Sequence, residues 1–557
     1  MSDQSAPRGL NTDPYGTEPP RAPLRGTVPG TELTRRGVLG LGAALGLVAA
    51  GGTAAAAPAR RPSATGKQLR SAVPLPEPYT VPLPIPSVLA PAGTSGGTDR
   101  YEITQRQVTA RILPGVPTTL WTYNGTYPGP TIESRRGRPV TVLHRNELPV
   151  PTVVHLHGGH TPAESDGYPT DLVLPEGWPD PASRRRRHGK AHMAHDPRAV
   201  TSRVTREYTY PLDQRAALLW YHDHRMDFTA PAIWRGLTGM HIVRDAVEDA
   251  LDLPCGEREL ALMIADRAFA ADGSLAYPAL DPELRDRPGV TEPYAAGVLG
   301  DVIVVNGAPW PVHEVDAVRH RLRLVNASNA RHYRLEAVTD DGHRLDLVQI
   351  GADQGLLAAP VTHTALPIAP SERYDVVIDF AGLRPGSRVR LRNRLGSGRT
   401  REVMAFRVAR AASDHSTIPK VLCDDLPTWR RSQATAVRRF TFRAGHAQQG
   451  RGWYIDGKPF DPSRTDVRTR RGAVEVWRFT ADVHHPVHIH QTGFRVLSRD
   501  GRAPLPYDAG LKDTVSLRPG ETAEVITRFD GHRGRYLFHC HNAEHEDMGM
   551  MANLEIV

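Results

Sequence analysis

The chain has 557 residues, of which 39% are hydrophobic, 23% are charged, 50 are Gly and 49 are Pro. This composition is that of a folded protein rich in turns, and it excludes a mainly disordered or collagen-like chain. Three cysteines exclude a scaffold built from disulfides. A net charge of +8 on so long a chain, without a basic patch, does not indicate a nucleic-acid partner.

The first segment, residues 1–57, has the pattern of a twin-arginine signal peptide. Thr34-Arg35-Arg36-Gly37 precedes an apolar stretch through Ala50 and a run of small residues that ends at Ala57. The apolar stretch is shorter than the roughly 20 residues that span a membrane. We therefore expect export in a bacterium, to a periplasmic, cell-surface or secreted location, with no membrane anchor after signal removal.

Proline-rich residues 58–98 follow, and we expect an extended lead-in without strand pairing. Beyond it, short β-branched runs alternate with Gly and Pro to the end of the chain, which predicts an all-β fold of sandwiches or barrels. The predicted divisions are a first domain over 99–247, a second over 248–412, a linker over 413–435 and a third domain over 436–557.

Two further features are secondary to this organisation. Residues 176–203 contain Arg184 to Arg187 and His188, His192 and His195, and we interpret them as a solvated surface loop.

Cys255 and Cys423 flank the second domain. Exported proteins can form disulfides, but spacing alone does not decide whether this pair does.

Histidine pairs of the form His-x-His recur in four segments. Each pair follows an apolar, strand-like run, and residues two apart on a strand share one face. Four pairs of imidazoles can therefore converge, two from the first domain and two from the third, as a metal site with several ions at a domain interface. The pairs are His155/His157, His222/His224, His488/His490 and His539/His541.

Cys540 lies between the two histidines of the last pair, so its side chain must point to the opposite face. On that side His485, His545 and Met550 are available. Two imidazoles, a thiolate and a thioether form the ligand set of a blue-copper electron-transfer centre. We therefore expect one copper at Cys540 and a second copper site on its two flanking histidines.

The sequence resembles the three-domain multicopper oxidases, in the group that contains laccases, bilirubin oxidase, spore-coat laccase and phenoxazinone synthase. The resemblance covers about residues 80–557. It is carried by residues 82–91 and 123–131, the His-Leu-His-Gly-Gly segment from His155, Trp220 to His224, Pro370 to Asp375, His485 to His490 and His539 to Met551. It implies three cupredoxin-like Greek-key domains.

Position by position, the resemblance also implies four copper ions. The type 1 copper would be bound by His485, Cys540, His545 and Met550, and the type 2 copper by His155 and His488. The type 3 pair would be bound by His157, His222, His224, His490, His539 and His541. Asp166 and Glu546 match acidic positions that deliver protons in the spore-coat group, and Asp223 is interpreted as a residue that orients its neighbouring histidines.

The function implied is the one-electron oxidation of small phenols or aminophenols, coupled to the four-electron reduction of dioxygen to water. A metallo-oxidase of cuprous or manganous ions is the alternative, although no Met-rich or acidic site over the type 1 copper is evident in the sequence. A copper-storage or electron-carrier protein would leave eight histidines unused, and a zinc hydrolase would leave Cys540 and Met550 without a role. The reducing substrate and the oligomeric state are not determined.

Overall fold

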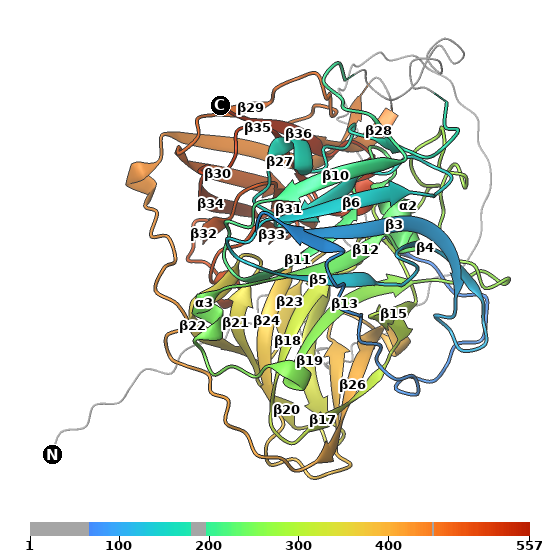
Figure 1. Ribbon diagram of the computed structural model, residues 1–557, viewed down its shortest axis with the longest axis vertical. Coiled ribbons are helices and arrows are strands. Elements are labelled where there is room, and N and C mark those ends of the chain that lie inside the picture. The colour runs from blue at the N-terminus through green and yellow to red at the C-terminus, as the bar shows by residue number, and fades with distance from the viewer. Residues whose placement is uncertain (1–65, 180–195, 448–449) are drawn as a thin grey trace, which may run out of the picture. The chain divides into compact units, whose positions relative to one another are not determined.

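Strands dominate the computed structural model, which describes residues 66–179, 196–447 and 450–557 (Figure 1). The signal-peptide segment 1–57 and the histidines of the basic loop lie outside the described residues. The predicted all-β fold is confirmed, because the α-helices of the described part are short. These are α2 (Thr229–Arg235), α3 (Ala246–Asp249) and α4 (Ala543–Asp547). Single 3-10 turns are η1 (Ala163–Ser165), η2 (Gly256–Arg258), η3 (Gly398–Arg401), η4 (Arg431–Gln433) and η5 (Pro506–Asp508).

The first two sheets have the orders β10-β6-β3-β2, with β4 paired to β3, and β5-β12-β11-β7. Period-two burial is clear in β10, where Arg206, Tyr208 and Tyr210 point inward and the residues between them do not. One hydrophobic core joins both sheets. The strands are β2 (Gly93–Ser95), β3 (Thr98–Ala110), β4 (Thr118–Tyr123), β5 (Gly129–Arg135), β6 (Val140–Asn146), β7 (Val154–His157), β10 (Thr205–Tyr210), β11 (Ala217–Asp223) and β12 (Thr238–Arg244), and a small sheet pairs β8 (Val173–Leu174) with β9 (Ser202–Arg203).

The next two sheets have the orders β16-β15-β13-β18-β24-β21-β22 and β17-β26-β25-β19-β20, with β23 paired to β19. Their facing sides form a second shared core. The strands are β13 (Glu259–Arg267), β15 (Val302–Val305), β16 (Ala308–Pro309), β17 (Val312–Asp316), β18 (Arg319–Asn326), β19 (Tyr333–Thr339), β20 (Arg344–Leu345), β21 (Leu347–Ala352), β22 (Gly355–His363), β23 (Leu366–Ile368), β24 (Arg373–Asp379), β25 (Arg388–Asn393) and β26 (Glu402–Arg410).

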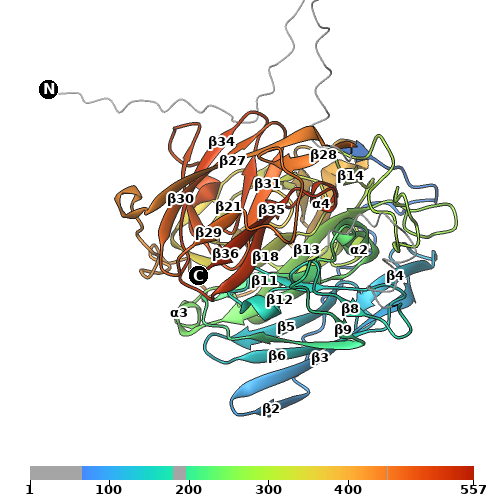
Figure 2. The same ribbon diagram turned by 90° about the horizontal axis from the view of Figure 1, so that it is seen from above.

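The last two sheets have the orders β28-β27-β30-β34-β32 and β29-β36-β35-β31-β33, around a third core. In the second of these sheets β31, β35 and β36 lie side by side (Figure 2). The strands are β27 (Ala436–Ala447), β28 (Gly450–Ile455), β29 (Val467–Thr469), β30 (Val474–Ala481), β31 (His485–Ile489), β32 (Phe494–Arg499), β33 (Thr514–Leu517), β34 (Thr522–Arg528), β35 (Gly534–Cys540) and β36 (Met551–Ile556).

These three pairs of sheets are compatible with three β domains, but the boundaries themselves remain a prediction, since the described residues all belong to one compact unit. The expectation of an unpaired lead-in is wrong. β1 (Lys67–Gln68) pairs in parallel with β14 (Val298–Leu299), and β2 pairs with β3. The residues between the prolines keep their N–H groups, and these are enough for short ladders.

Two other features bear on the sequence expectations. Cys255 is exposed and Cys423 is buried, and both are free thiols, so the two do not form a disulfide. Among the described residues, no helix combines the length and the apolar character needed to cross a membrane.

Candidate functional site

The four predicted histidine pairs lie at the ends of four strands, β7, β11, β31 and β35. In the half of the site that comes from the first pair of sheets, His222 is directly opposite His155 across the antiparallel β7–β11 pair. In the half that comes from the last pair of sheets, His488 is directly opposite His539 across β31 and β35. Strand pairing therefore brings two His-x-His pairs together within each half of the site.

The eight rings form one continuous group, which we call the histidine cluster. Its members are His155, His157, His222, His224, His488, His490, His539 and His541, each no more than 2% exposed. Contacts between the first and last thirds of the chain close it. His157 stacks on His488 with ring centroids 3.7 Å apart, and His155 stacks on His490 at 4.0 Å. The structure thus brings all eight predicted residues together.

The histidine cluster fits metal ions by its donor atoms. The Nε2 atoms of His155, His222, His224, His488 and His541 and the Nδ1 atom of His157 are buried without a hydrogen-bond partner. Burial lowers the pKa of these imidazoles, to about 3 for His222 and about 4 for His224, so they carry the lone pair that a metal requires. In the trio His224, His490 and His539 the donor atoms lie within 4.8 Å of one another. Buried imidazole nitrogens without partners are costly unless an ion satisfies them.

Both predicted carboxylates touch the histidine cluster. Asp166 Oδ2 lies 2.8 Å from His490 Nδ1, and the Asp166 carbonyl oxygen lies 2.5 Å from His155 Nδ1. Glu546 Oε2 lies 3.2 Å from His539 Nδ1, and Oε1 lies 3.5 Å from His224 Nδ1. Burial raises the pKa of Asp166 well above its usual range. Burial would also raise the pKa of Glu546, but the imidazoles of His224 and His539 lower it to about 2.

A second group, the Cys540 cluster, lies on the other face of β35. Its members are His485, Cys540, His545 and Met550, and none is more than 1% exposed. Cys540 Sγ lies 3.3 Å from His485 Nδ1 and 3.6 Å from His545 Nδ1, and these two nitrogens are 3.2 Å apart. The alternation of side chains along β35 thus directs Cys540 away from His539 and His541, as predicted.

The short helix α4 returns the chain to Cys540. Asn542 caps this helix by accepting a hydrogen bond from the His545 backbone N–H, which places His545 one turn beyond the strand. The Met550 N–H then donates to the His545 carbonyl, and the Cys540 N–H donates to the Met550 carbonyl. The Met550 backbone is therefore hydrogen-bonded to both His545 and Cys540, and its side chain lies in the same hydrophobic core as Cys540.

Three residues around these clusters were not identified from the sequence. Asp513 Oδ1 lies 3.1 Å from His157 Nε2 and 3.5 Å from His488 Nδ1, and its carbonyl lies 2.9 Å from the same His488 nitrogen. Asp482 Oδ1 lies 2.9 Å from His485 Nε2, and Trp453 stacks on His545 at 3.7 Å. Of these three residues, only Asp482 could have been found from the sequence, because it lies three positions before His485.

Asp223 contacts its neighbour His222 through its backbone carbonyl, whereas its carboxylate has another role. Its carboxylate accepts backbone N–H groups from Val153 and Arg225, and only its carbonyl oxygen contacts an imidazole, that of His222. The side chain therefore holds the backbone of neighbouring segments, because period-two alternation points it away from His222 and His224.

Comparison with known proteins agrees with this geometry. Family models described as multicopper oxidase match residues 104–178 and 428–557. A laccase from Bacillus stratosphericus is 35% identical, over 86% of this chain and 99% of the relative. A bilirubin oxidase from Albifimbria verrucaria is 33% identical, over 85% of this chain and 80% of the relative. The crystal structure of a multicopper oxidase from Pediococcus acidilactici superposes with a TM-score of 0.73 at 30% identity, covering 88% of this chain and 93% of that one.

Eight clustered imidazoles, a separate thiolate site and this extent of similarity have one common explanation. The chain belongs to the multicopper oxidase family, in its laccase group, and is a copper-dependent oxidoreductase that uses dioxygen as its acceptor.

Proposed function

We propose that this protein oxidises small phenols or aminophenols in one-electron steps, with four copper ions bound to the two clusters. The observation that carries this proposal is the position of Cys540. Its side chain belongs to one cluster, while its chain neighbours His539 and His541 belong to the other. A covalent path through the backbone on either side of Cys540 therefore joins the two clusters.

The twelve predicted residues would hold the ions as follows. His485, Cys540, His545 and Met550 would hold a type 1 copper, and His155 with His488 a type 2 copper. The type 3 pair would be held by His157, His222, His224, His490, His539 and His541. The ring contacts within His157, His222 and His541, and the close donor atoms of His224, His490 and His539, support this division into two sets of three. When bound, copper supplies one-electron oxidation at Cys540 and four-electron reduction of dioxygen at the histidine cluster.

Asp166 and Glu546 would deliver the protons that the formation of water requires. Asp166 contacts His490 and Glu546 contacts both His539 and His224, so each carboxylate borders the histidine cluster. A positioned carboxylate within hydrogen-bond reach of the reacting atoms is the usual requirement for general acid catalysis.

Asp482 would contact the reducing substrate. His485 and His545 are shielded from solvent, whereas the Asp482 side chain is 36% exposed and bonds directly to His485. A carboxylate at this position accepts a hydrogen bond from a phenolic hydroxyl or an aromatic amine. It would also attract a cuprous or manganous ion, which keeps a metallo-oxidase as the second candidate.

Oxygen uptake by the copper-loaded protein tests both candidates. The donors are 2-aminophenol, 2,6-dimethoxyphenol, bilirubin, cuprous ion and manganous ion. We expect uptake with the phenols, and uptake with the metal ions alone would favour the second candidate. Cys540→Ser should abolish the blue colour and turnover, while Cys423→Ser, which alters another buried cysteine, should preserve both. No oxygen uptake with any donor would contradict the proposal.

We also propose export by the twin-arginine route, supported by the Arg35-Arg36 pattern of residues 1–57. Replacing both arginines by lysine should keep the protein in the cytoplasm of a bacterial host, as cell fractionation would measure. Unchanged export of this variant would contradict the assignment.

A further inference from the structure

Arg373 comes from the second pair of sheets, which contributes no residue to either cluster. It begins β24 within the segment Pro370 to Asp375, and its side chain is 1% exposed. Its two terminal nitrogens bind the two carboxylate oxygens of Asp513, Nη1 to Oδ1 at 2.6 Å and Nη2 to Oδ2 at 2.5 Å. This paired geometry fixes the plane of a carboxylate in a way that a lysine does not.

Asp513 transmits this contact to two imidazoles. Its Oδ1 lies 3.1 Å from His157 Nε2, and its carbonyl lies 2.9 Å from His488 Nδ1. On both rings the opposite nitrogen is the unpartnered one, Nδ1 of His157 and Nε2 of His488. An acceptor on one ring nitrogen sets the tautomer and the direction of the other, which would bind the metal. Burial would raise the pKa of Asp513, but Arg373 and His157 hold it well below its usual range.

The guanidinium of Arg373 is itself held on several sides. Its Nη2 donates to the Asp353 carbonyl at 2.9 Å, and its Nε donates to the Leu218 carbonyl at 3.1 Å. Gly158 follows His157 with φ +87°, and a Cβ there would lie 2.4 Å from Arg373 Nη2. Glycine at this position therefore allows the guanidinium to lie against the backbone next to His157.

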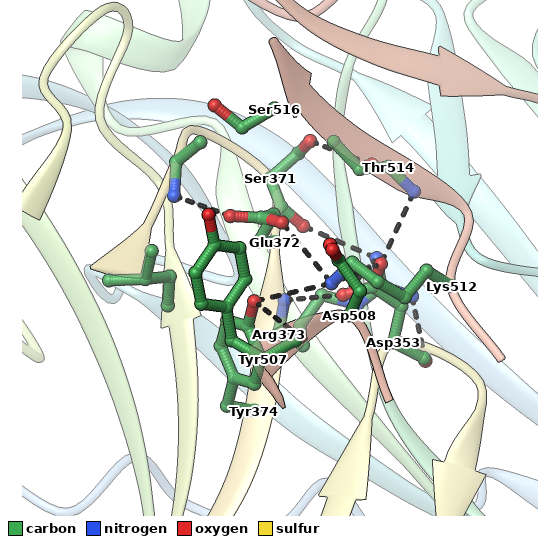
Figure 3. Close-up of polar contacts among 12 residues, drawn as sticks. Asp353, Ser371, Glu372, Arg373, Tyr374, Tyr507, Asp508, Lys512, Thr514 and Ser516 are labelled. Carbon is green, nitrogen blue, oxygen red and sulfur yellow. Dashed lines mark hydrogen bonds and ion pairs between the residues drawn. The ribbon is translucent and has the colours of Figure 1, made fainter. Parts of the chain in front are cut away.

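A buried lysine completes the network on the other side. Lys512 Nζ, which is fully buried, lies 3.3 Å from Asp353 Oδ2 and 3.2 Å from Glu372 Oε1. Figure 3 shows Asp353, Glu372 and Lys512 pointing toward one another beside Arg373. Asp353 Oδ1 also accepts the Arg373 backbone N–H at 2.7 Å. Residues of the second and third pairs of sheets are thereby joined by charges that remain paired away from water.

We propose that Arg373 is a positioning residue for the copper site at His157 and His488, acting through Asp513. The second pair of sheets thus has a role in the metal site although it holds no ligand. This inference rests on the proposed function, because it requires copper on the histidine cluster. Loss of such an outer contact typically weakens metal binding about 10- to 100-fold.

The test uses Arg373→Lys in the copper-loaded holoenzyme, with Arg321→Lys as the matched control. Arg321 is equally buried in the same pair of sheets and contacts both oxygens of Asp375, away from the histidine cluster. The readouts are copper per chain, the type 2 signal in electron paramagnetic resonance, and the type 1 absorption. We expect R373K to lose or shift the type 2 signal, to bind that copper at least tenfold more weakly and to keep its blue colour, while R321K keeps all three.

An unchanged type 2 signal and copper content in R373K would overturn the inference, and so would equal losses in R321K. If R373K does not fold, Asp513→Asn keeps the arginine but weakens the pair, and the same outcomes decide. A wild-type protein that binds no type 2 copper would instead contradict the proposed function itself.

Discussion

Replacing Asp166 by Asn tests whether this residue delivers protons or only orients the neighbouring histidines. The substitution keeps the size of the side chain and the oxygen that lies 2.8 Å from His490 Nδ1, and it leaves the backbone contact to His155 in place. At most about one neutral hydrogen bond is altered, worth about 1 kcal/mol, which corresponds to about fivefold in rate. Loss of a general acid would instead lower kcat by about 10²- to 10⁴-fold.

The assay measures oxygen consumption at saturating 2-aminophenol, together with bleaching of the blue colour under argon. We expect kcat of D166N to fall at least 100-fold, in line with that range, while anaerobic bleaching stays as fast as in the wild type. The control is Asp171→Asn, another buried aspartate of the same segment, which pairs with Arg206 and should retain most of its activity. A fall of about fivefold or less would refute the assignment of Asp166 to proton delivery.

Three further predictions concern stability and the Cys540 cluster. Glu248 and Glu259 lie against Arg321 and Arg323, which lower both carboxyl pKa values to about 2 although burial opposes this. The two carboxylates stabilise the fold above the pKa of an unfolded glutamate, near 4.5, and this stabilisation is lost as the pH falls toward 2. Tm, measured by calorimetry at a series of pH values, should therefore drop steeply over that range. The drop should be shallower in E259Q. Removing copper with a chelator should lower Tm by several degrees, because a ligand at about 100 times its Kd contributes about 2.7 kcal/mol; an identical Tm would contradict ion binding at the clusters. Trp453→Phe removes the hydrogen bond to the Ala295 carbonyl, 2.7 Å long, but keeps a ring over His545. It should cost about 1–3 kcal/mol in thermal unfolding with copper content unchanged, and a loss of copper would assign the indole a direct part in the site.

The eight histidines of the histidine cluster and Cys540 can be identified from the sequence alone, for a local reason. Side chains alternate along a strand, so each His-x-His pair presents two imidazoles on one face, and Cys540 must face away from its neighbours. This is a property of a few consecutive residues. The structure keeps both histidines of a pair within β7, and in β11, β31 and β35 the second histidine follows the last residue of the strand. The all-β fold is predicted for a similar reason, from the spacing of β-branched runs and turns.

Only the tertiary structure shows which imidazoles of the predicted pairs contact one another and which other groups from distant parts of the chain join them. His157 reaches His488, Asp513 lies between those two imidazoles, and Arg373 reaches Asp513 from the second pair of sheets. No spacing in the sequence encodes these contacts, because they depend on how separate sheets pack against one another. Packing also decided two smaller points that the sequence left open or predicted wrongly. Cys255 and Cys423 are free thiols, and the lead-in residues pair as strands. Local periodicity determined the donor atoms, whereas packing between sheets determined their partners, because only burial in a shared interior brings distant side chains within hydrogen-bond distance.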